Sequence, residues 1–273
     1  MSSFPSTQNA ATVISSCDAY SDLWPVFFHF FFKHWPASPF PVYLISNRRH
    51  YKDPRVITVP VGEDKSWSDN LINALKTIKE ENLFVWLDDF LVDRDIDSVA
   101  MTSCIDQLDQ AGGRYLAVDQ FGDTGAPVGN GWMRQIESDN LRAGLNLSLW
   151  KKTFLSQILE PGCSIWAAES RLRKLNREGG QGLYYMKKEA PKVVSYVEAV
   201  KGQFWKPQGI AYLREQGIKA NLKRRPFPPQ GNDFLSKFFR SCYKRRMKSL
   251  SAKEVRAAEE GKGLEVFPLP GAP

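Results

Sequence analysis

The sequence predicts a single three-layer α/β domain built on a mainly parallel central sheet. Short apolar runs rich in Val, Ile and aromatic residues alternate with amphipathic stretches from about residue 10 onward. An early β-α-β-α-β order favours parallel strands joined by right-handed crossovers. At 273 residues, of which 42% are hydrophobic and 25% charged, the chain is long enough and apolar enough to bury a full core.

The strands and helices follow one another with short connections. Strands are expected at 11–15, 41–46, 56–59, 83–87, 115–118, 145–149, 184–186 and 193–197. Helices are expected at 23–34, 66–79, 96–110, 151–159 and 164–176. The aromatic run 24–35 is too short for the roughly 20 residues that a helix needs to cross a bilayer, so we expect a buried helix there.

Cysteine and histidine usage argues against several kinds of site. The four cysteines are far apart and match no metal-ligand spacing, which favours reduced thiols in a cytoplasmic protein. The three histidines form no zinc-binding pattern and no basis for a histidine triad.

The strand 83–87 runs directly into two adjacent carboxylates, Asp88 and Asp89. Acids at the carboxyl end of a strand buried on both faces lie at the sheet edge, where ligands bind in α/β folds. Adjacent carboxylates repel each other, and a divalent cation with oxygen ligands, Mg²⁺ or Mn²⁺, offsets that repulsion. The alternative is that both acids cap the next segment or face water. Either way, we expect both to be exposed.

Positive charge is concentrated near the C-terminus. Residues 219–256 carry twelve Lys and Arg against two acids, whereas the chain as a whole has a net charge of +7. We therefore divide the chain into a domain at 10–218, a basic helical extension at 219–256 and a poorly ordered, flexible tail at 257–273. Within the extension, 233–250 reads as a basic amphipathic helix. It fits an anionic membrane surface, the alternative being that its apolar face packs on the domain; nucleic acid fits it less well.

Six motifs in a fixed order suggest a family. They are Asp18-Ala-Tyr-Ser-Asp-Leu-Trp24, Pro39-Phe-Pro-Val-Tyr-Leu44, Gly62-Glu-Asp-Lys-Ser-Trp-Ser68, Leu87-Asp-Asp-Phe90, Leu147-Ser-Leu-Trp-Lys-Lys152 and Trp166-Ala-Ala-Glu169. Across residues 11–218 the chain resembles bacterial capsule and lipopolysaccharide glycosyltransferases with the A-type nucleotide-sugar fold.

The resemblance implies roles for particular residues. It assigns Asp88 and Asp89 to the metal that holds the donor diphosphate, although that fold usually shows Asp-x-Asp and this chain shows Asp-Asp-Phe. Glu169 becomes the candidate general base of an inverting transfer; a retaining enzyme does not need one, and Glu169 could instead lie on a solvated helix face. Donor contacts are expected from Asp18, Tyr20, Asn47, Arg48, Trp67 and Ser68.

Three functions remain open. The first is transfer of a sugar from a nucleotide-sugar donor to a polysaccharide or lipid-linked glycan, in the cytoplasm and peripherally on the inner face of the cell membrane. The second is nucleotidyl transfer, which shares the fold but usually needs a glycine-rich loop after the first strand; none follows Ile14. The third is a non-catalytic adaptor that binds a membrane or nucleic acid.

Overall fold

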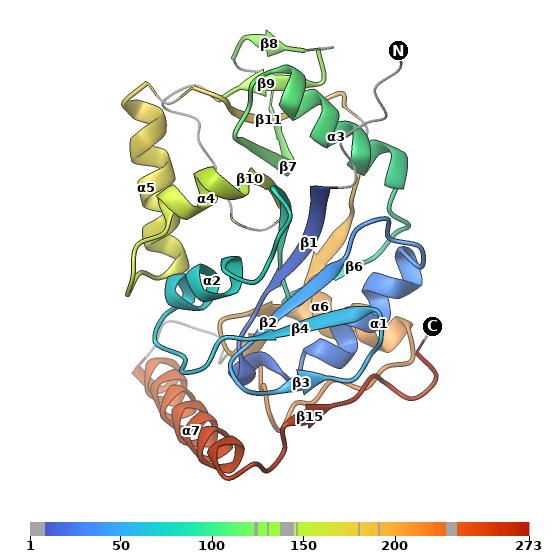
Figure 1. Ribbon diagram of the computed structural model, residues 1–273. Coiled ribbons are helices and arrows are strands. Elements are labelled where there is room, and N and C mark those ends of the chain that lie inside the picture. Colours follow the sequence, from blue (N-terminus) through green and yellow to red (C-terminus); the bar gives the residue numbers. More distant parts are fainter. Residues whose placement is uncertain are drawn as a thin grey trace.

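A nine-stranded mixed sheet forms the centre of the computed structural model (Figure 1), which describes residues 9–122, 125–129, 131–136, 145, 147–179, 181–190, 192–227 and 234–272. Its strands are β1 (Ala10–Ser15), β2 (Val42–Ser46), β4 (Val56–Pro60), β5 (Asn82–Leu87), β7 (Tyr115–Gly122), β8 (Pro127–Val128), β9 (Met133–Gln135), β10 (Ser148–Lys151) and β11 (Leu183–Lys187). Their order in space is β4-β2-β1-β5-β10-β7-β11-β9-β8.

The first half of the sheet is parallel. β4, β2, β1 and β5 are parallel neighbours, and Val13 of β1 pairs with Tyr43 on one side and Val85 on the other. β10 then enters antiparallel between β5 and β7, and β9 and β8 add an antiparallel edge beyond β11. The carboxyl ends of β1, β2 and β5 therefore meet at one edge of the sheet.

Helices cover both faces, which confirms the predicted three layers (Figure 1). One face packs against α1 (Trp24–His34), α3 (Ser98–Gln110) and α6 (Pro207–Glu215), and the other against α2 (Trp67–Leu75), α4 (Lys152–Ile158) and α5 (Ile165–Arg177). Each interface forms its own apolar cluster, because successive side chains of a strand point to opposite faces.

The aromatic helix α1 forms where it was predicted. Pro25 lies in its first turn, where the missing N–H costs nothing, and the Trp35 N–H closes the helix on the Phe31 carbonyl. Its five phenylalanines are at most 3% exposed. Pro36 follows directly and prevents continuation.

Three two-stranded sheets join late segments of the chain to earlier ones or to each other. β6 (Phe90–Val92) pairs with β12 (Tyr196–Glu198), and β13 (Val200–Lys201) pairs with β14 (Phe204–Trp205). β3 (His50–Tyr51) pairs in parallel with β15 (Glu265–Val266). This last pairing runs against the expectation of a poorly ordered tail at 257–273, since it attaches 265–266 to the domain.

The C-terminal region is a long helix, α7 (Phe234–Glu259), on the outside of the domain (Figure 1). It begins within one residue of the predicted start and runs nine residues further. No helix in the described part of the chain combines the length and apolar character needed to span a membrane. Part of the segment 219–227, which the sequence placed in the extension, instead contacts the domain. The Arg225 side chain is completely buried, and the Pro226 carbonyl accepts from the Trp205 N–H.

Candidate functional site

Asp18 fixes the loop after β1 to the loop after β2. It opens a short 3-10 helix, η2 (Asp18–Tyr20), and is only 8% exposed. Its carboxylate accepts hydrogen bonds from the backbone N–H groups of Asn47 at 2.9 Å, Arg48 at 3.0 Å and Arg49 at 3.2 Å. In return, the side-chain oxygen of Asn47 accepts a hydrogen bond from the Asp18 N–H at 3.0 Å. These two residues shape the site by holding its loops, and their expected donor contacts stay predictions.

The start of α2 closes the neighbouring side of this edge. Ser66 caps the helix by accepting from the Asp69 N–H, and the half-buried Trp67 donates its indole N–H to Ser15 Oγ at 2.9 Å. Trp67 thus lies at the end of β1, and its expected donor contact stays a prediction.

Ser68 is held by main-chain groups. It is completely buried, donates to the Glu160 carbonyl at 2.5 Å and accepts from the Cys163 N–H at 2.9 Å. Its hydroxyl joins α2 to the connection between α4 and α5, and its expected donor contact stays a prediction. Arg48, by contrast, is exposed beyond the end of β2.

The acid pair lies at the carboxyl end of β5, but Asp88 is only 4% exposed, which overturns the expectation that both acids face solvent. Asp88 accepts a hydrogen bond from Ser16 Oγ, which in turn accepts from the Trp24 indole at 2.7 Å. Burial, followed by the charge of Asp89, raises the pKa of Asp88 to about 8. The pair therefore holds a proton near neutral pH unless a cation is bound.

Asp89 is half-buried and differs from Asp88 in its contacts. Among the described residues, no hydrogen-bond partner satisfies its buried Oδ1 atom. Burial raises the pKa of Asp89 to about 7, and the nearby Glu198 carboxylate adds to the increase. Glu198, which pairs with Lys206, reaches this position because the Ala199 N–H donates to the Asp89 carbonyl at 2.8 Å.

Arg225 is the site residue that sequence reasoning missed most clearly. Its guanidinium donates to both carboxylate oxygens of Asp22, at 2.8 and 2.9 Å, and to the Ala19 carbonyl at 3.0 Å. It also lies over the Tyr20 ring, 4.4 Å from the ring centroid. The Tyr20 hydroxyl donates to the Gly202 carbonyl at 2.7 Å. Arg225 thereby fixes the Tyr20 ring and contributes positive charge near Asp88 and Asp89.

The sequence held only an indirect signal for Arg225. Asp22 is the second aspartate of the Asp-x-Tyr-x-Asp loop, and a carboxylate in a packed loop needs a cation, but no local pattern says which one. Sequence reasoning also missed Ser16, Glu198 and Lys206, because neither their spacing nor their residue type distinguishes them from ordinary surface or core positions. Trp24 ends the first motif, but its indole bond to Ser16 was not predicted.

Glu169 lies on α5, at the helix-covered face opposite α1. It is half-buried and accepts a hydrogen bond from the Leu145 N–H at 3.3 Å. Burial raises the pKa of Glu169, although the Leu145 bond and Arg173 act in the opposite direction. Leu145 shortly precedes β10, whose Ser148 pairs with Val85 of β5. Glu169 is thus joined to the segment that leads into β10, and the structure shows no contact between it and the acid pair among the described residues.

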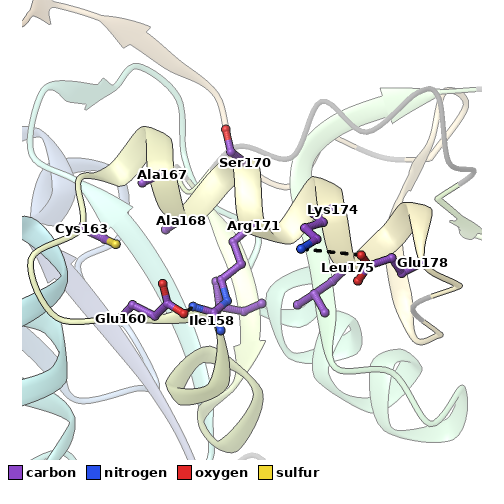
Figure 2. Close-up of a pocket in the computed structure, with 10 residues that line it drawn as sticks. All are labelled: Ile158, Glu160, Cys163, Ala167, Ala168, Ser170, Arg171, Lys174, Leu175 and Glu178. Atoms are coloured by element: carbon purple, nitrogen blue, oxygen red, sulfur yellow. Dashed lines mark ion pairs between the residues drawn. The ribbon is translucent and has the colours of Figure 1, made fainter.

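A cavity of about 520 Å³ lies between α4 and α5 (Figure 2). Arg171 reaches across it to Glu160, and Lys174 is 3.8 Å from Glu178. None of the predicted site residues lines it. The candidate site is therefore defined by its buried polar groups at the sheet edge and not by this cavity.

Comparisons with known proteins show only distant likeness. No family model matches the chain, and no curated protein matches it. Among solved structures, residues 1–349 of TarS from S. aureus are 12% identical, with a TM-score of 0.44 over 67% of this chain and 59% of that one. This chain therefore spans less than two thirds of TarS 1–349.

Two further structures are similar at the same level. The UTP-bound UGPase from Acinetobacter baumannii is 11% identical, with a TM-score of 0.45 over 86% of this chain and 98% of that one. A 4-diphosphocytidyl-2C-methyl-D-erythritol synthase is 16% identical, with a TM-score of 0.42 over 76% and 97%. Likeness this distant assigns neither an activity nor a ligand to this chain.

Proposed function

We propose that this protein is a glycosyltransferase that moves a sugar from a nucleotide-sugar donor to a polysaccharide or lipid-linked glycan. The observation that carries the proposal is the acid pair at the end of β5, where the pKa values of Asp88 and Asp89 are raised to about 8 and about 7. Raised pKa values beside loops fixed by Asp18 and Arg225 are typical of a functional site and unusual for a structural turn.

The residues at this edge fit a divalent cation whose remaining ligands come from the phosphates of the substrate. The described residues contain no group of three or more His, Cys, Asp or Glu able to hold a metal alone. Mg²⁺ is commonly bound by one or two carboxylates together with substrate phosphates, and the unpartnered Asp89 Oδ1 is an oxygen of the required kind. Asp88 and Asp89 would hold Mg²⁺ or Mn²⁺, which would neutralise charge on the departing nucleoside diphosphate.

The remaining residues take the other tasks of the transfer. Tyr20, held by Arg225, and Trp67, held by Ser15, offer ring surfaces on which a nucleoside can pack. Arg48 is exposed, and its guanidinium suits the diphosphate. In an inverting transfer, an acceptor hydroxyl attacks the anomeric carbon, the bond to the diphosphate oxygen breaks, and Glu169 takes the hydroxyl proton.

The alternative of nucleotidyl transfer is less well supported by the local structure. Where such an enzyme places a glycine-rich loop, this chain places η2, whose Asp18 carboxylate occupies the backbone N–H groups of the next loop. We also propose a location in the cytoplasm, peripherally at the inner face of the cell membrane.

A donor panel tests the proposal. Purified protein is titrated with UDP-, GDP- and CMP-linked sugars, with and without Mn²⁺, and turnover is measured on a glycan acceptor. We expect one donor class to bind with Mn²⁺, and Asp88→Asn or Asp89→Asn to abolish turnover without unfolding the chain. Glu169→Gln should keep donor binding and lower transfer by roughly 10²–10⁴-fold. Binding of no nucleotide sugar would favour the adaptor, and retention of anomeric configuration would remove the role of Glu169.

A further inference from the structure

The first turns of α7 carry a group of exposed apolar side chains. Phe234, Leu235, Phe238 and Phe239 are 80%, 64%, 52% and 50% exposed, and we call these four residues the α7 patch. The rings lie against one another, with centroids 6.5 Å apart for Phe234 and Phe238 and 6.1 Å for Phe238 and Phe239. Single exposed apolar residues are ordinary, but four together on two turns indicate an interaction surface.

The later part of α7 has different surroundings. The Tyr243 ring meets Phe204 edge to face, with centroids 6.2 Å apart. Further along, Glu254 accepts from Arg224 at 3.0 Å, and Arg224 also donates to the Ala19 carbonyl of η2 at 3.2 Å. The helix thus meets β14 through Tyr243 and reaches η2 through Glu254 and Arg224, while the side chains of the α7 patch are exposed. The sequence left two alternatives for this helix, packing on the domain or exposure to a partner. The later part of α7 contacts the domain, and the α7 patch is exposed.

The charge around the α7 patch identifies the kind of partner. Residues 234–250 contain six Lys and Arg and no acid. Of these, Lys237, Arg245 and Arg246 are exposed. An anionic bilayer offers both an apolar interior for phenylalanine and leucine and phosphate headgroups for the bases. An acidic protein or a nucleic acid matches the charge but leaves the three rings in water.

We propose that the α7 patch inserts into the interfacial region of an anionic membrane and that the flanking bases bind lipid headgroups. Tyr243, one turn after the α7 patch, meets Phe204, and the Tyr20 hydroxyl donates to the nearby Gly202 carbonyl. An inserted patch therefore holds the loop of Tyr20 close to the bilayer. If the proposed transfer is correct, the acceptor is then a glycan carried on a lipid. This last step rests on the proposed function, whereas membrane binding does not.

Vesicle sedimentation of the full chain tests the insertion. The parent and the variant Phe234→Ser/Phe238→Ser/Phe239→Ser are spun with vesicles of phosphatidylcholine alone or mixed 7:3 with phosphatidylglycerol. We expect the parent to prefer the anionic vesicles at least about tenfold and the variant to lose most of that binding. Phe267→Ser, which alters a phenylalanine that is 62% exposed elsewhere, is the matched control and should bind like the parent.

A second variant separates charge from insertion. Lys237→Gln/Arg245→Gln/Arg246→Gln should bind both kinds of vesicle equally, and the parent should release anionic vesicles as salt rises. Equal vesicle binding by the parent and the phenylalanine variant would overturn the proposal. So would a parent dimer that the variant converts to a monomer without any lipid binding, because the α7 patch would then contact a second copy.

The two proposals fail in different ways. If the donor panel shows no nucleotide-sugar binding while anionic vesicles still bind through the α7 patch, the transferase proposal fails and the membrane surface stands. If the patch variant keeps turnover on a soluble glycan but loses it on a lipid-linked one, both are supported. Equal loss on both acceptors would contradict the lipid-linked acceptor.

Discussion

Two phenylalanine-rich helices, α1 and α7, have opposite surroundings. In α1 the rings of Phe27, Phe28 and Phe31 pack on one another, and Phe31 also meets Trp35 and Trp86. In α7 the rings of Phe234 and Phe238 stack in a similar way but remain at least half exposed. The difference lies in the other residues of each helix. α1 contains a single Lys and no Arg, and that Lys lies in its last turn, whereas Lys and Arg residues are spread through α7.

The contrast teaches that a stretch of phenylalanines does not by itself identify a core helix. Lys and Arg side chains keep their charges in water, so a helix with bases on most turns can present only a narrow stripe to a core. In α7 the Tyr243 ring meets Phe204 of the domain, whereas the side chains of the α7 patch remain exposed.

Replacing one phenylalanine in each helix should give the largest difference in the free energy of unfolding. Phe31→Ala removes a fully buried ring and should lower the free energy of unfolding by about 3–5 kcal/mol. Phe238→Ala removes a half-exposed ring and should change it by no more than about 0.5 kcal/mol. Urea unfolding of both variants measures this. A loss of similar size in Phe238→Ala would mean that the α7 patch is packed on the domain.

A substitution at the boundary between domain and extension should have the next largest effect on stability. Arg225→Gln leaves the Asp22 carboxylate without its bidentate partner and should cost about 3 kcal/mol of stability, as expected when one partner of a buried ion pair is removed. A chain that ends after Ile218 loses Arg225 and also the Pro226 carbonyl, which accepts from the Trp205 N–H. A chain that ends after Pro229 keeps both.

Paired truncations therefore sharpen the comparison between the two regions. We expect the chain ending at 229 to stay folded and to bind donor, and the chain ending at 218 to melt at lower temperature and to bind donor weakly. Thermal melting and nucleotide titration measure the two properties. Equal melting temperatures for both truncations would show that 219–227 contributes nothing to the domain.

Local sequence signals predicted the parts of the fold that depend on near neighbours. The parallel strands up to β5, the aromatic helix α1 and the position of Asp88 and Asp89 follow from periodicity and from the sharp change from Leu87 to Asp88. The antiparallel direction of β10 was not predictable, because the expected strand at 145–149 carries no mark of orientation.

The polar contacts of the site were harder to predict because their partners are distant or belong to the backbone. Asp18 and Ser68 have the residue types of ligand contacts, yet their partners are main-chain groups on other segments. Arg225 lies 203 residues beyond Asp22, and no local pattern links them. Burial of Asp88 likewise depends on Ser16 and on the α1 face, which only the folded chain brings together.

The last prediction concerns the pH dependence of stability at Asp88. Its pKa is raised from 3.8 to about 8 because it is buried and because Asp89 is adjacent. Between these two pH values the unfolded chain releases the proton while the folded chain keeps it, so stability falls as pH rises and levels off above about 8. Asp88→Asn cannot ionise and avoids that loss. The variant should therefore melt close to the parent at pH 5 and above it at pH 8, as measured by thermal melting.

Mn²⁺ at pH 8 should raise the melting temperature of the parent more than that of the variant, because only the parent offers both carboxylates to the cation. A melting difference that stays constant with pH, or a parent that is the more stable protein at pH 8, would show that Asp88 is ionised in the folded chain without cost.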